Sequence, residues 1–399
     1  MEATIMNRYL LAGCAAAALA LGAGAANAQA KFEVKVGGDA YFEGGWVDQD
    51  RDANTRSVDF RNRFRVIVTP TAKADNGLEY GGRIRMRANA GANNGRTMDA
   101  DRGYIFAQGA FGQVQMGVTN SFNDATYVTA PQDYLPLGIY DGVISWMGNA
   151  DVGGGLGALN GSMLNQSLVV ENNATKIVYF SPRFAGLQVG GSYLPRNDDS
   201  HASVNRSDLA SVAPSAVANR GFANKAGQSF VAFEDLVEVG ANYNNTFGGV
   251  NVKASAGYFW GSAPGGVAGT SVEDLNAWQV GAQVGYAGFS LGGSYTDFGE
   301  SGQIQAPGSD NTKSRLWVVG AQYTAGPIVV GANYKNSQDA GQLYAAGKRK
   351  LEVYELGVGY TVAPGLTLQA QYDHFKLDND SAGLDDKGDV VLVRSVLAF

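Results

Sequence analysis

Cysteine is almost missing from this sequence, because the one cysteine among its 399 residues is Cys14. Cys14 lies in a segment that we expect to be removed, so the mature protein is expected to contain neither a disulfide nor a thiol nucleophile. Histidine occurs only at His201 and His374, and no cluster of cysteine and histidine suggests a zinc site. No arrangement of serine, histidine and an orienting partner is evident, so the sequence does not favour an enzyme.

Long apolar runs are missing after the first thirty residues, where no stretch reaches the ~20 apolar residues that a membrane-spanning helix needs. The start of the chain has the features of an export signal: Arg8 is basic, residues 9–22 are apolar, and Ala26-Asn27-Ala28 supplies small residues before Gln29. We therefore predict a cleaved signal peptide over residues 1–28 and one mature domain over 29–399. A lipoprotein cleavage site at Cys14 is disfavoured, because most of the apolar sequence follows it.

What the chain does contain is glycine, at 55 residues, together with segments in which apolar and polar residues alternate. In the first segment, Val34, Val36 and Phe42 share one face, and Lys35 and Asp39 share the other. A soluble β-sandwich also alternates, but here the polar faces are rich in charge and the apolar faces are smooth and end in aromatic residues. That combination favours an outer-membrane β-barrel, whose outside meets lipid and whose inside is polar.

Sixteen such segments follow one another. The predicted strands cover residues 31–47, 56–69, 78–89, 101–108, 112–119, 174–181, 186–194, 235–244, 249–260, 276–286, 289–297, 313–324, 328–335, 350–362, 366–375 and 388–399. Their connections alternate between short and long, as expected for a barrel with tight turns on one rim and long loops on the other. The fold class is therefore all-β, a sixteen-stranded antiparallel transmembrane barrel.

Outward tyrosines recur along the second half of the chain and should form two aromatic girdles at the lipid–water boundaries. They are Tyr193, Tyr243, Tyr258, Tyr286, Tyr295, Tyr323, Tyr334, Tyr360 and Tyr372.

The third long connection, from about residue 119 to 175, is far longer than most connections in a compact domain and is expected to be functional. Neither lysine nor arginine occurs between Arg102 and Lys176, whereas this stretch contains several acids. Upstream, two strands carry arginines at alternate positions. An acidic, base-free loop and two arginine ladders suggest one site with a transverse electric field.

Several local motifs resemble the general diffusion porins of Gram-negative outer membranes, especially the alphaproteobacterial type. They are Asn76-Gly77-Leu78-Glu79-Tyr80-Gly81, Ala110-Phe111-Gly112-Gln113-Val114-Gln115-Met116-Gly117, Ile177-Val178-Tyr179-Phe180-Ser181-Pro182, Val239-Gly240-Ala241-Asn242-Tyr243 and the terminal Phe399 on an alternating strand. The resemblance extends over the whole mature chain. It implies a homotrimer in which the third external loop folds inward and narrows the lumen.

The resemblance also implies the residues of the constriction. The candidates on the basic barrel wall are Arg61, Arg63, Arg65, Arg83, Arg85 and Arg87, and those on the acidic loop are Asp124, Asp133, Asp141 and Asp151. A simpler interpretation is that the arginines belong to a solvated inner face and form salt bridges with Glu79 or Asp59. Both interpretations can hold at once.

The expected function is a water-filled pore for passive diffusion of small hydrophilic solutes and ions, with lipid and lipopolysaccharide as surroundings and no nucleic-acid partner. The alternatives are a substrate-specific channel and a surface or adhesive barrel anchor. No cofactor is expected. Asp378, Asp380, Gly383 and Asp389 loosely resemble a calcium loop, but Ala382 occupies a ligand position. A solvated acidic loop is therefore the favoured interpretation of these residues.

Overall fold

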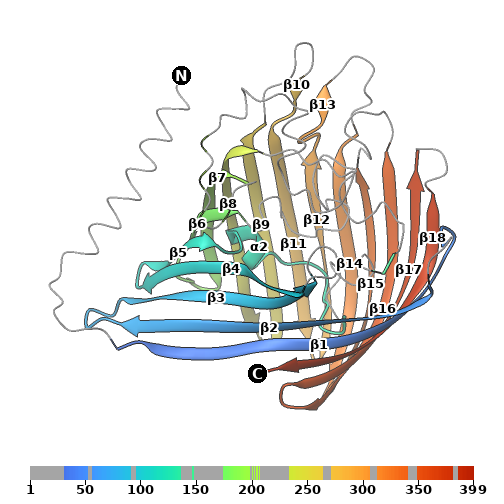
Figure 1. Ribbon diagram of the computed structural model, residues 1–399, viewed down its shortest axis with the longest axis horizontal. Coiled ribbons are helices and arrows are strands. Elements are labelled where there is room, and N and C mark those ends of the chain that lie inside the picture. Colours follow the sequence, from blue (N-terminus) through green and yellow to red (C-terminus); the bar gives the residue numbers. More distant parts are fainter. Residues whose placement is uncertain are drawn as a thin grey trace.

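The computed structural model describes residues 31–52, 56–90, 96–135, 146–147, 174–197, 200, 202, 204, 206, 233–263, 271–305, 312–339, 348–380 and 385–399. Sixteen antiparallel strands close into one barrel, in which each strand pairs with its neighbours in the chain and β1 pairs with β18 (Figure 1). Among the described residues, no helix is both long and apolar enough to cross a membrane.

The bounds of the elements follow in chain order. They are β1 (Glu33–Gln49), β2 (Val58–Lys73), β3 (Glu79–Ala90), β4 (Arg96–Gly109), β5 (Gly112–Val118), α2 (Phe122–Thr126), β6 (Thr175–Phe180), β7 (Leu187–Arg196), β8 (Glu234–Phe247), β9 (Val250–Ser262), β10 (Ser271–Val272), β11 (Leu275–Tyr286), β12 (Phe289–Gly299), β13 (Ile304–Gln305), β14 (Ser314–Ala325), β15 (Ile328–Asp339), β16 (Arg349–Ala363), β17 (Leu366–Asn379) and β18 (Asp386–Ala398).

The sixteen predicted strands are confirmed. The largest difference in a boundary is at β4, which begins at Arg96 rather than at residue 101. Two elements were not predicted: the short helix α2 within the third long connection, and the two-stranded sheet of β10 and β13 outside the barrel. The predicted signal peptide lies outside the described residues, so it stays a prediction.

Tight turns join the strands at one rim, and their backbone conformation explains part of the glycine content. Gly248 and Gly249, between β8 and β9, have φ angles of 55° and 86°. Left-handed φ angles at both central residues give a turn whose twist matches that of the flanking strands, and glycine adopts them without steric cost. The glycines thus fix the strand register at this rim.

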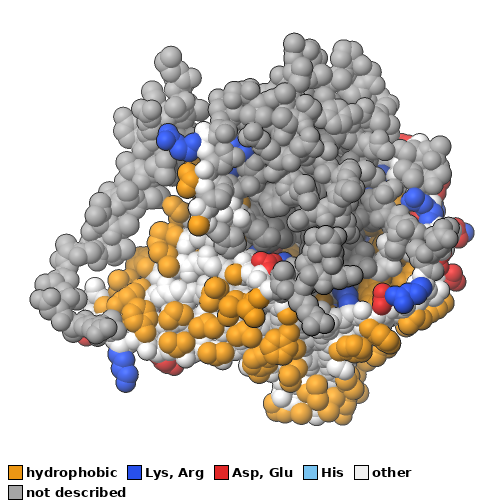
Figure 2. Space-filling model, in the orientation of Figure 1, with side chains coloured by type: hydrophobic (Ala, Val, Ile, Leu, Met, Phe, Trp, Pro, Cys, Tyr) orange, Lys and Arg blue, Asp and Glu red, His pale blue; other side chains and the backbone are white. Residues whose placement is uncertain are grey.

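The alternation of apolar and polar residues in the sequence places apolar side chains on the outer face of the barrel and polar side chains on its inner face. On β11, Trp278, Val280 and Val284 are 40%, 45% and 49% exposed, whereas Ala277 and Gln279, on the other face, are buried. Figure 2 shows hydrophobic side chains spread over the outer face of the front strands. A barrel of this size with an apolar exterior can satisfy its backbone hydrogen bonds in lipid because it has no free edge.

The tyrosine girdles are confirmed by the register. All nine tyrosines lie on the outward face, and they alternate between the two rims along successive strands. Near one rim, Trp278 packs on Tyr295 and Trp317 packs on Tyr334, with ring centroids 5.2 and 5.0 Å apart. Near the other, Phe289 packs on Tyr323 at 4.3 Å.

Candidate pore constriction

The six candidate arginines lie on the inward faces of β2 and β3. Arg65 on β2 is opposite Arg87 on β3, and Arg63 is opposite Tyr41 on β1. The outward neighbours Phe60, Phe64 and Ile84 are exposed at the lipid-facing side. Strict alternation on two adjacent strands therefore gathers the arginines into one patch on the inner wall, as predicted.

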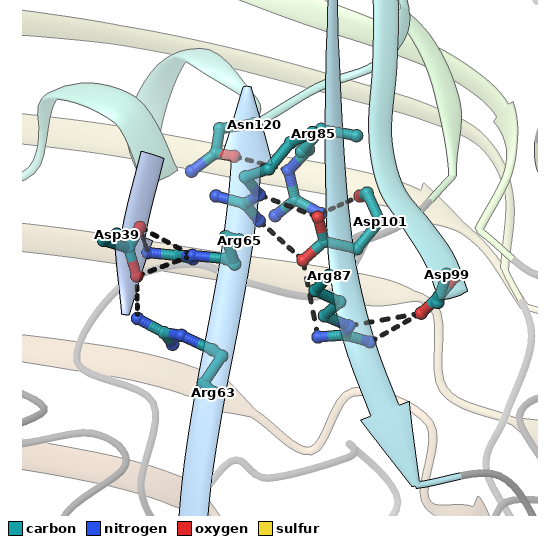
Figure 3. A network of polar contacts seen from close by, with 9 residues as sticks. Asp39, Arg63, Arg65, Arg85, Arg87, Asp99, Asp101 and Asn120 are labelled. Carbon is teal, nitrogen blue, oxygen red and sulfur yellow. Dashed lines mark hydrogen bonds and ion pairs between the residues drawn. The ribbon is translucent and has the colours of Figure 1, made fainter. Parts of the chain in front are cut away.

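Asp39 on β1 is the first carboxylate of this patch. It accepts hydrogen bonds from Arg63 Nη2 at 3.0 Å and from Arg65 Nε at 2.8 Å, and the Arg65 Nη2 atom lies 2.7 Å from Asp39 Oδ2 (Figure 3). The side chains of Asp39, Arg63 and Arg65 are 20% to 26% exposed. The pairs are thus formed at a partly solvated surface, where ion pairs stabilise modestly.

Glu43, two inward positions further along β1, is fully buried and joins three side chains. Arg61 Nε donates to Glu43 Oε1, and the Arg394 guanidinium of β18 lies 2.8 Å from Oε2. Trp146, from the third long connection, donates its indole N–H to Oε1 at 2.8 Å. A buried carboxylate is stable only when it is paired and hydrogen-bonded in this way.

Asp101 on β4 reaches the patch through an irregularity in the strand. The register between β3 and β4 shifts after Arg85, which places Asp101 as an extra residue on the inner side. Arg85 donates to both of its oxygens, at 2.7 and 2.8 Å, and Arg87 Nη1 lies 3.4 Å from it. Such a β-bulge redirects a side chain that simple alternation would point outward.

Two further contacts complete the network of Figure 3. Arg87 donates to Asp99 at 2.9 Å, and Arg102 donates to the side-chain oxygen of Asn120 at 2.8 Å. Arg83 is exposed and forms no ion pair with another residue that the structure describes.

The prediction that the arginines form salt bridges with Glu79 or Asp59 was wrong. Glu79 accepts from Gln108 at 2.7 Å, and Asp59 pairs with Arg56 at 3.3 Å. The partners are instead Asp39, Glu43, Asp99 and Asp101, because the stagger between the strands, which the sequence pattern does not give, decides which inward residues meet.

After Asn120, which accepts from Arg102, the described part of the third long connection runs onto the inner wall at β7 to β9. Phe122 and Asn123 of α2 lie over three inward glycines: Gly190 of β7, Gly240 of β8 and Gly257 of β9. A Cβ atom at any of these glycines would overlap Phe122 or Asn123. The backbone N–H of Asn123 donates to Glu238, and that of Phe122 donates to Ser192 at 2.9 Å. The helix is thus seated directly on the wall.

Residues 127–135 continue across the inward faces of the following strands. The backbone N–H of Val128 donates to Ser255 on β9 at 2.8 Å. The ring of Tyr134 lies over Gly331 and Gly357, on β15 and β16. Burial, with Glu355 and Asp373 nearby, raises the pKa of Tyr134 above its usual value, so this phenol stays neutral.

The candidate loop acids are only partly described. Asp133 accepts a hydrogen bond from Gln322 on β14 at 2.7 Å, and Asp124 lies in the first turn of α2. No contact between either of them and the six arginines is found within the described residues. Asp141 and Asp151 lie outside the described residues, so the acidic side of the constriction and the full inward course of the loop stay predictions.

Trp146 and Met147 are the next described part of this connection. They pack with inward apolar residues of β1 and β16 to β18, on the other side of the barrel from α2, namely Val47, Leu351, Val353, Phe375, Leu377, Val390 and Leu392. Trp146 and Arg394 were not identified from the sequence. Arg394 had a usable signal, because it is the only basic residue at an inward position of the last strand and stands between the apolar Leu392 and Val396.

The remaining sequence candidates contribute little to the site. His374 lies on the outward face beside Asp389, at 2.9 Å, and His201 lies outside the described residues. In the calcium candidate, Asp378 pairs with Lys376 and Asp389 also accepts from Tyr372, while Gly383 is not described. No group of three or more potential metal ligands is found among the described residues.

A closed antiparallel barrel with an apolar exterior and a charged inner wall defines the class of transmembrane β-barrels of the outer membrane. The model of the Gram-negative porin family matches residues 15–380. The chain therefore belongs to the Gram-negative porin family. This membership places it in the outer membrane and indicates a channel rather than an enzyme.

Individual relatives are distant. A porin of Rhodobacter capsulatus is 33% identical over 95 residues, a match that covers 24% of this chain and 28% of that protein. Among solved structures, a variant of the Rh. blastica porin has a TM-score of 0.56 at 17% identity and covers 92% of this chain and all of its own. A Vibrio cholerae OmpT lacking loop L8 has a TM-score of 0.57 at 13% identity, covering 92% and 99%. These similarities show the fold.

Proposed function

We propose that the protein is a water-filled pore through which small hydrophilic solutes and ions diffuse passively. The observation that carries this proposal is the division of the inner wall. Arg61, Arg63, Arg65, Arg85 and Arg87 keep 20% to 35% of their side-chain exposure on one side. Residues 122–135 cover the inward faces of β7 to β16 on the other. The solvated arginines therefore mark the side along which solutes pass.

In this proposal the constriction lies between the arginine patch and the third long connection. Acids of that connection, with Asp124, Asp133, Asp141 and Asp151 as candidates, would face the guanidinium groups across the lumen. The resulting transverse field orients water and dipolar solutes, and it disfavours apolar solutes, whose entry would displace ordered water. Passage involves no chemical step and follows the gradient of the solute.

The proposed surroundings are lipid and lipopolysaccharide, with a homotrimer as the assembly. Support for the lipid contact comes from the exposed apolar residues and the tyrosine girdles of the outer face. The homotrimer rests on the family resemblance.

Liposome swelling with neutral sugars of increasing size tests the proposal. The purified protein should admit the sugars at rates that fall smoothly with their size. One strongly favoured sugar would indicate a substrate-specific channel, and absence of uptake would indicate a barrel that only anchors its loops; either result contradicts the proposed general pore. Liposomes prepared without protein provide the control.

A further inference from the structure

An open polar cleft, here called the turn-rim cleft, lies on the inner wall at the rim of tight turns. Its volume is about 470 Å³, which is within the range of sites that hold small solutes. The ends of β2 to β7 supply side chains that line it, among them Lys73, Glu79, Gln108, Gln113, Phe180 and Gln188. The strand register sets Glu79 opposite Gln108 and Gln108 opposite Gln113, so these side chains form one row along the wall.

Two glutamines of the cleft belong to a directional chain of hydrogen bonds. Thr119 donates to Gln115 at 2.6 Å, and Gln115 donates to Gln113 at 2.8 Å. Gln113 donates to Gln108 at 2.6 Å, and Gln108 donates to Glu79 at 2.7 Å. Because each amide donates toward the carboxylate, the bonds polarise one another and hold the amides in fixed orientations.

The three glutamines that line the cleft share the same unused bonding capacity. Within the part of the chain that the structure describes, Gln108 and Gln113 each donate one hydrogen bond and accept one. Gln188 likewise donates to the carbonyl of Ser181 at 2.9 Å and accepts from Arg183 at 3.1 Å. An amide side chain has two N–H donors and two acceptor lone pairs. All three glutamines are only half-buried, so one donor and one acceptor site of each is left for a solute.

The charges at the margin of the cleft do not select an ion. Lys73 and Glu79 are opposite each other in the register of β2 and β3, so their fields on a solute partly cancel. Arg183 donates to the side-chain oxygens of Gln188 and Asn242, at 3.1 and 2.7 Å. The cleft therefore suits a neutral solute that both donates and accepts hydrogen bonds.

We propose that the turn-rim cleft binds neutral polyhydroxylated solutes, of which sugars are the chemical class. The site rests on the proposed pore function and adds a class of solute to it. Each hydroxyl group donates and accepts, so neighbouring hydroxyls of a sugar match the spare donors and acceptors of successive glutamines. The ring of Phe180 gives the C–H groups of the sugar an apolar surface. Because the cleft is open, the solute is retained briefly and then released.

The test uses the full-length protein in planar bilayers, with the trisaccharide raffinose as the probe. Polyethylene glycol of similar mass is the reference solute, because its ether oxygens accept hydrogen bonds but do not donate them. Raffinose should reduce the ion conductance of the unaltered protein at a lower concentration than polyethylene glycol does. Gln113→Met keeps the length of the side chain but removes its amide. It should need roughly threefold to tenfold more raffinose for the same reduction, the factor expected for one or two lost hydrogen bonds.

A second cleft variant, Gln188→Met, removes the amide on the other side of the cleft and should lose raffinose sensitivity by a similar factor. It keeps the proposal testable if Gln113→Met does not fold. The control is Gln369→Met, which removes an inward amide at the same rim on β17, away from the cleft. The control should respond to raffinose as the unaltered protein does, and all variants should respond equally to polyethylene glycol.

If raffinose and polyethylene glycol act at equal concentrations on the unaltered protein, the site is overturned. Full raffinose sensitivity in both cleft variants overturns it too, as does an equal loss of sensitivity in Gln369→Met. These results leave the pore intact. Absence of current from the unaltered protein overturns the proposed function and the site with it, so the two failures are distinguishable.

Discussion

At the scale of single residues, the inner wall depends on carboxylates that each serve more than one cation. Glu43 joins β2, β18 and the third long connection, and Asp101 joins two arginines of β3. Neighbouring strands therefore supply the acids that hold the arginines in fixed orientations. Partial neutralisation within the wall reduces repulsion between the arginines but leaves their outer N–H groups in contact with water.

Replacement of Asp101 by asparagine tests this balance. The substitution retains the shape of the side chain but removes one negative charge that faces Arg85 and Arg87. We expect the permeability ratio of anions to cations to rise by about twofold to fivefold, since that factor corresponds to at most ~1 kcal/mol in a screened field. Reversal potentials in a salt gradient measure the ratio. A shift toward cations would contradict the assignment.

Trp146 gives a second residue-level prediction. In Trp146→Phe the aromatic packing on β1 is kept, while the hydrogen bond to Glu43 is lost. Because a bond from a neutral donor to a buried charge contributes about 1.5–3 kcal/mol, the contact should open more often. Single-channel records should show more current noise. Trp46→Phe, on the outward face of β1, is the matched control and should leave the current noise unchanged. If Trp146→Phe channels are as quiet as those of the unaltered protein, the hydrogen bond to Glu43 does not restrain the third long connection.

At the scale of elements, small inward residues on successive strands create room for the third long connection. Gly190, Gly240 and Gly257 accommodate α2, Gly281 accommodates the carbonyl of Val128, and Gly331 and Gly357 accommodate Tyr134. In a strand, glycine often marks such a close approach of another segment. The high glycine content thus has two sources, tight turns at one rim and this row inside the barrel.

Gly257→Val should displace the helix α2, because the added side chain would overlap Asn123, which is 4% exposed. Overpacking of this kind costs about 1–3 kcal/mol and is relieved by movement of the less constrained partner. Single-channel conductance should therefore change. Gly103→Val is the matched control, since nothing lies near a Cβ atom at that outward position. Identical conductance for both variants would show that the position of α2 does not affect the pore.

The strands were predictable because their signal is local: alternation and turn residues determine where each begins and ends. Contacts between side chains of different strands were harder to predict from the sequence. Asp39 was correctly assigned to the polar face, but its pairing with Arg63 and Arg65 depends on the stagger between β1 and β2. Asp101 could not be assigned at all, because the bulge breaks the alternation from which inward positions are inferred.

At the scale of the whole molecule, the barrel is closed by the pairing of β1 with β18. The backbone N–H of Gly38 donates to the carbonyl of Phe399 at 2.8 Å, and the N–H of Phe399 donates back to Gly38 at 3.1 Å. The Phe399 ring also packs on Phe64, with centroids 5.8 Å apart. Phe399 thus seals the seam between β1 and β18 beside Gly38.

Deletion of Phe399 should therefore reduce the yield of folded barrel. Two backbone hydrogen bonds and one aromatic contact are lost at a seam that has no other strand to replace them. The fraction of protein that migrates as the compact form in unheated gel electrophoresis measures folding. Phe399→Trp keeps both backbone bonds and an aromatic ring, so it should fold nearly as well as the unaltered chain. A normal yield after the deletion would show that the seam is stable without its last residue.

We propose that the arginine patch lines the narrowest part of a diffusion pore. Single-channel recording on a variant with Arg63, Arg65, Arg83 and Arg85 all replaced by glutamine tests it most directly. Removal of four positive charges should change the conductance and shift the ion selectivity toward cations. Conductance and selectivity equal to those of the unaltered protein would contradict the claim.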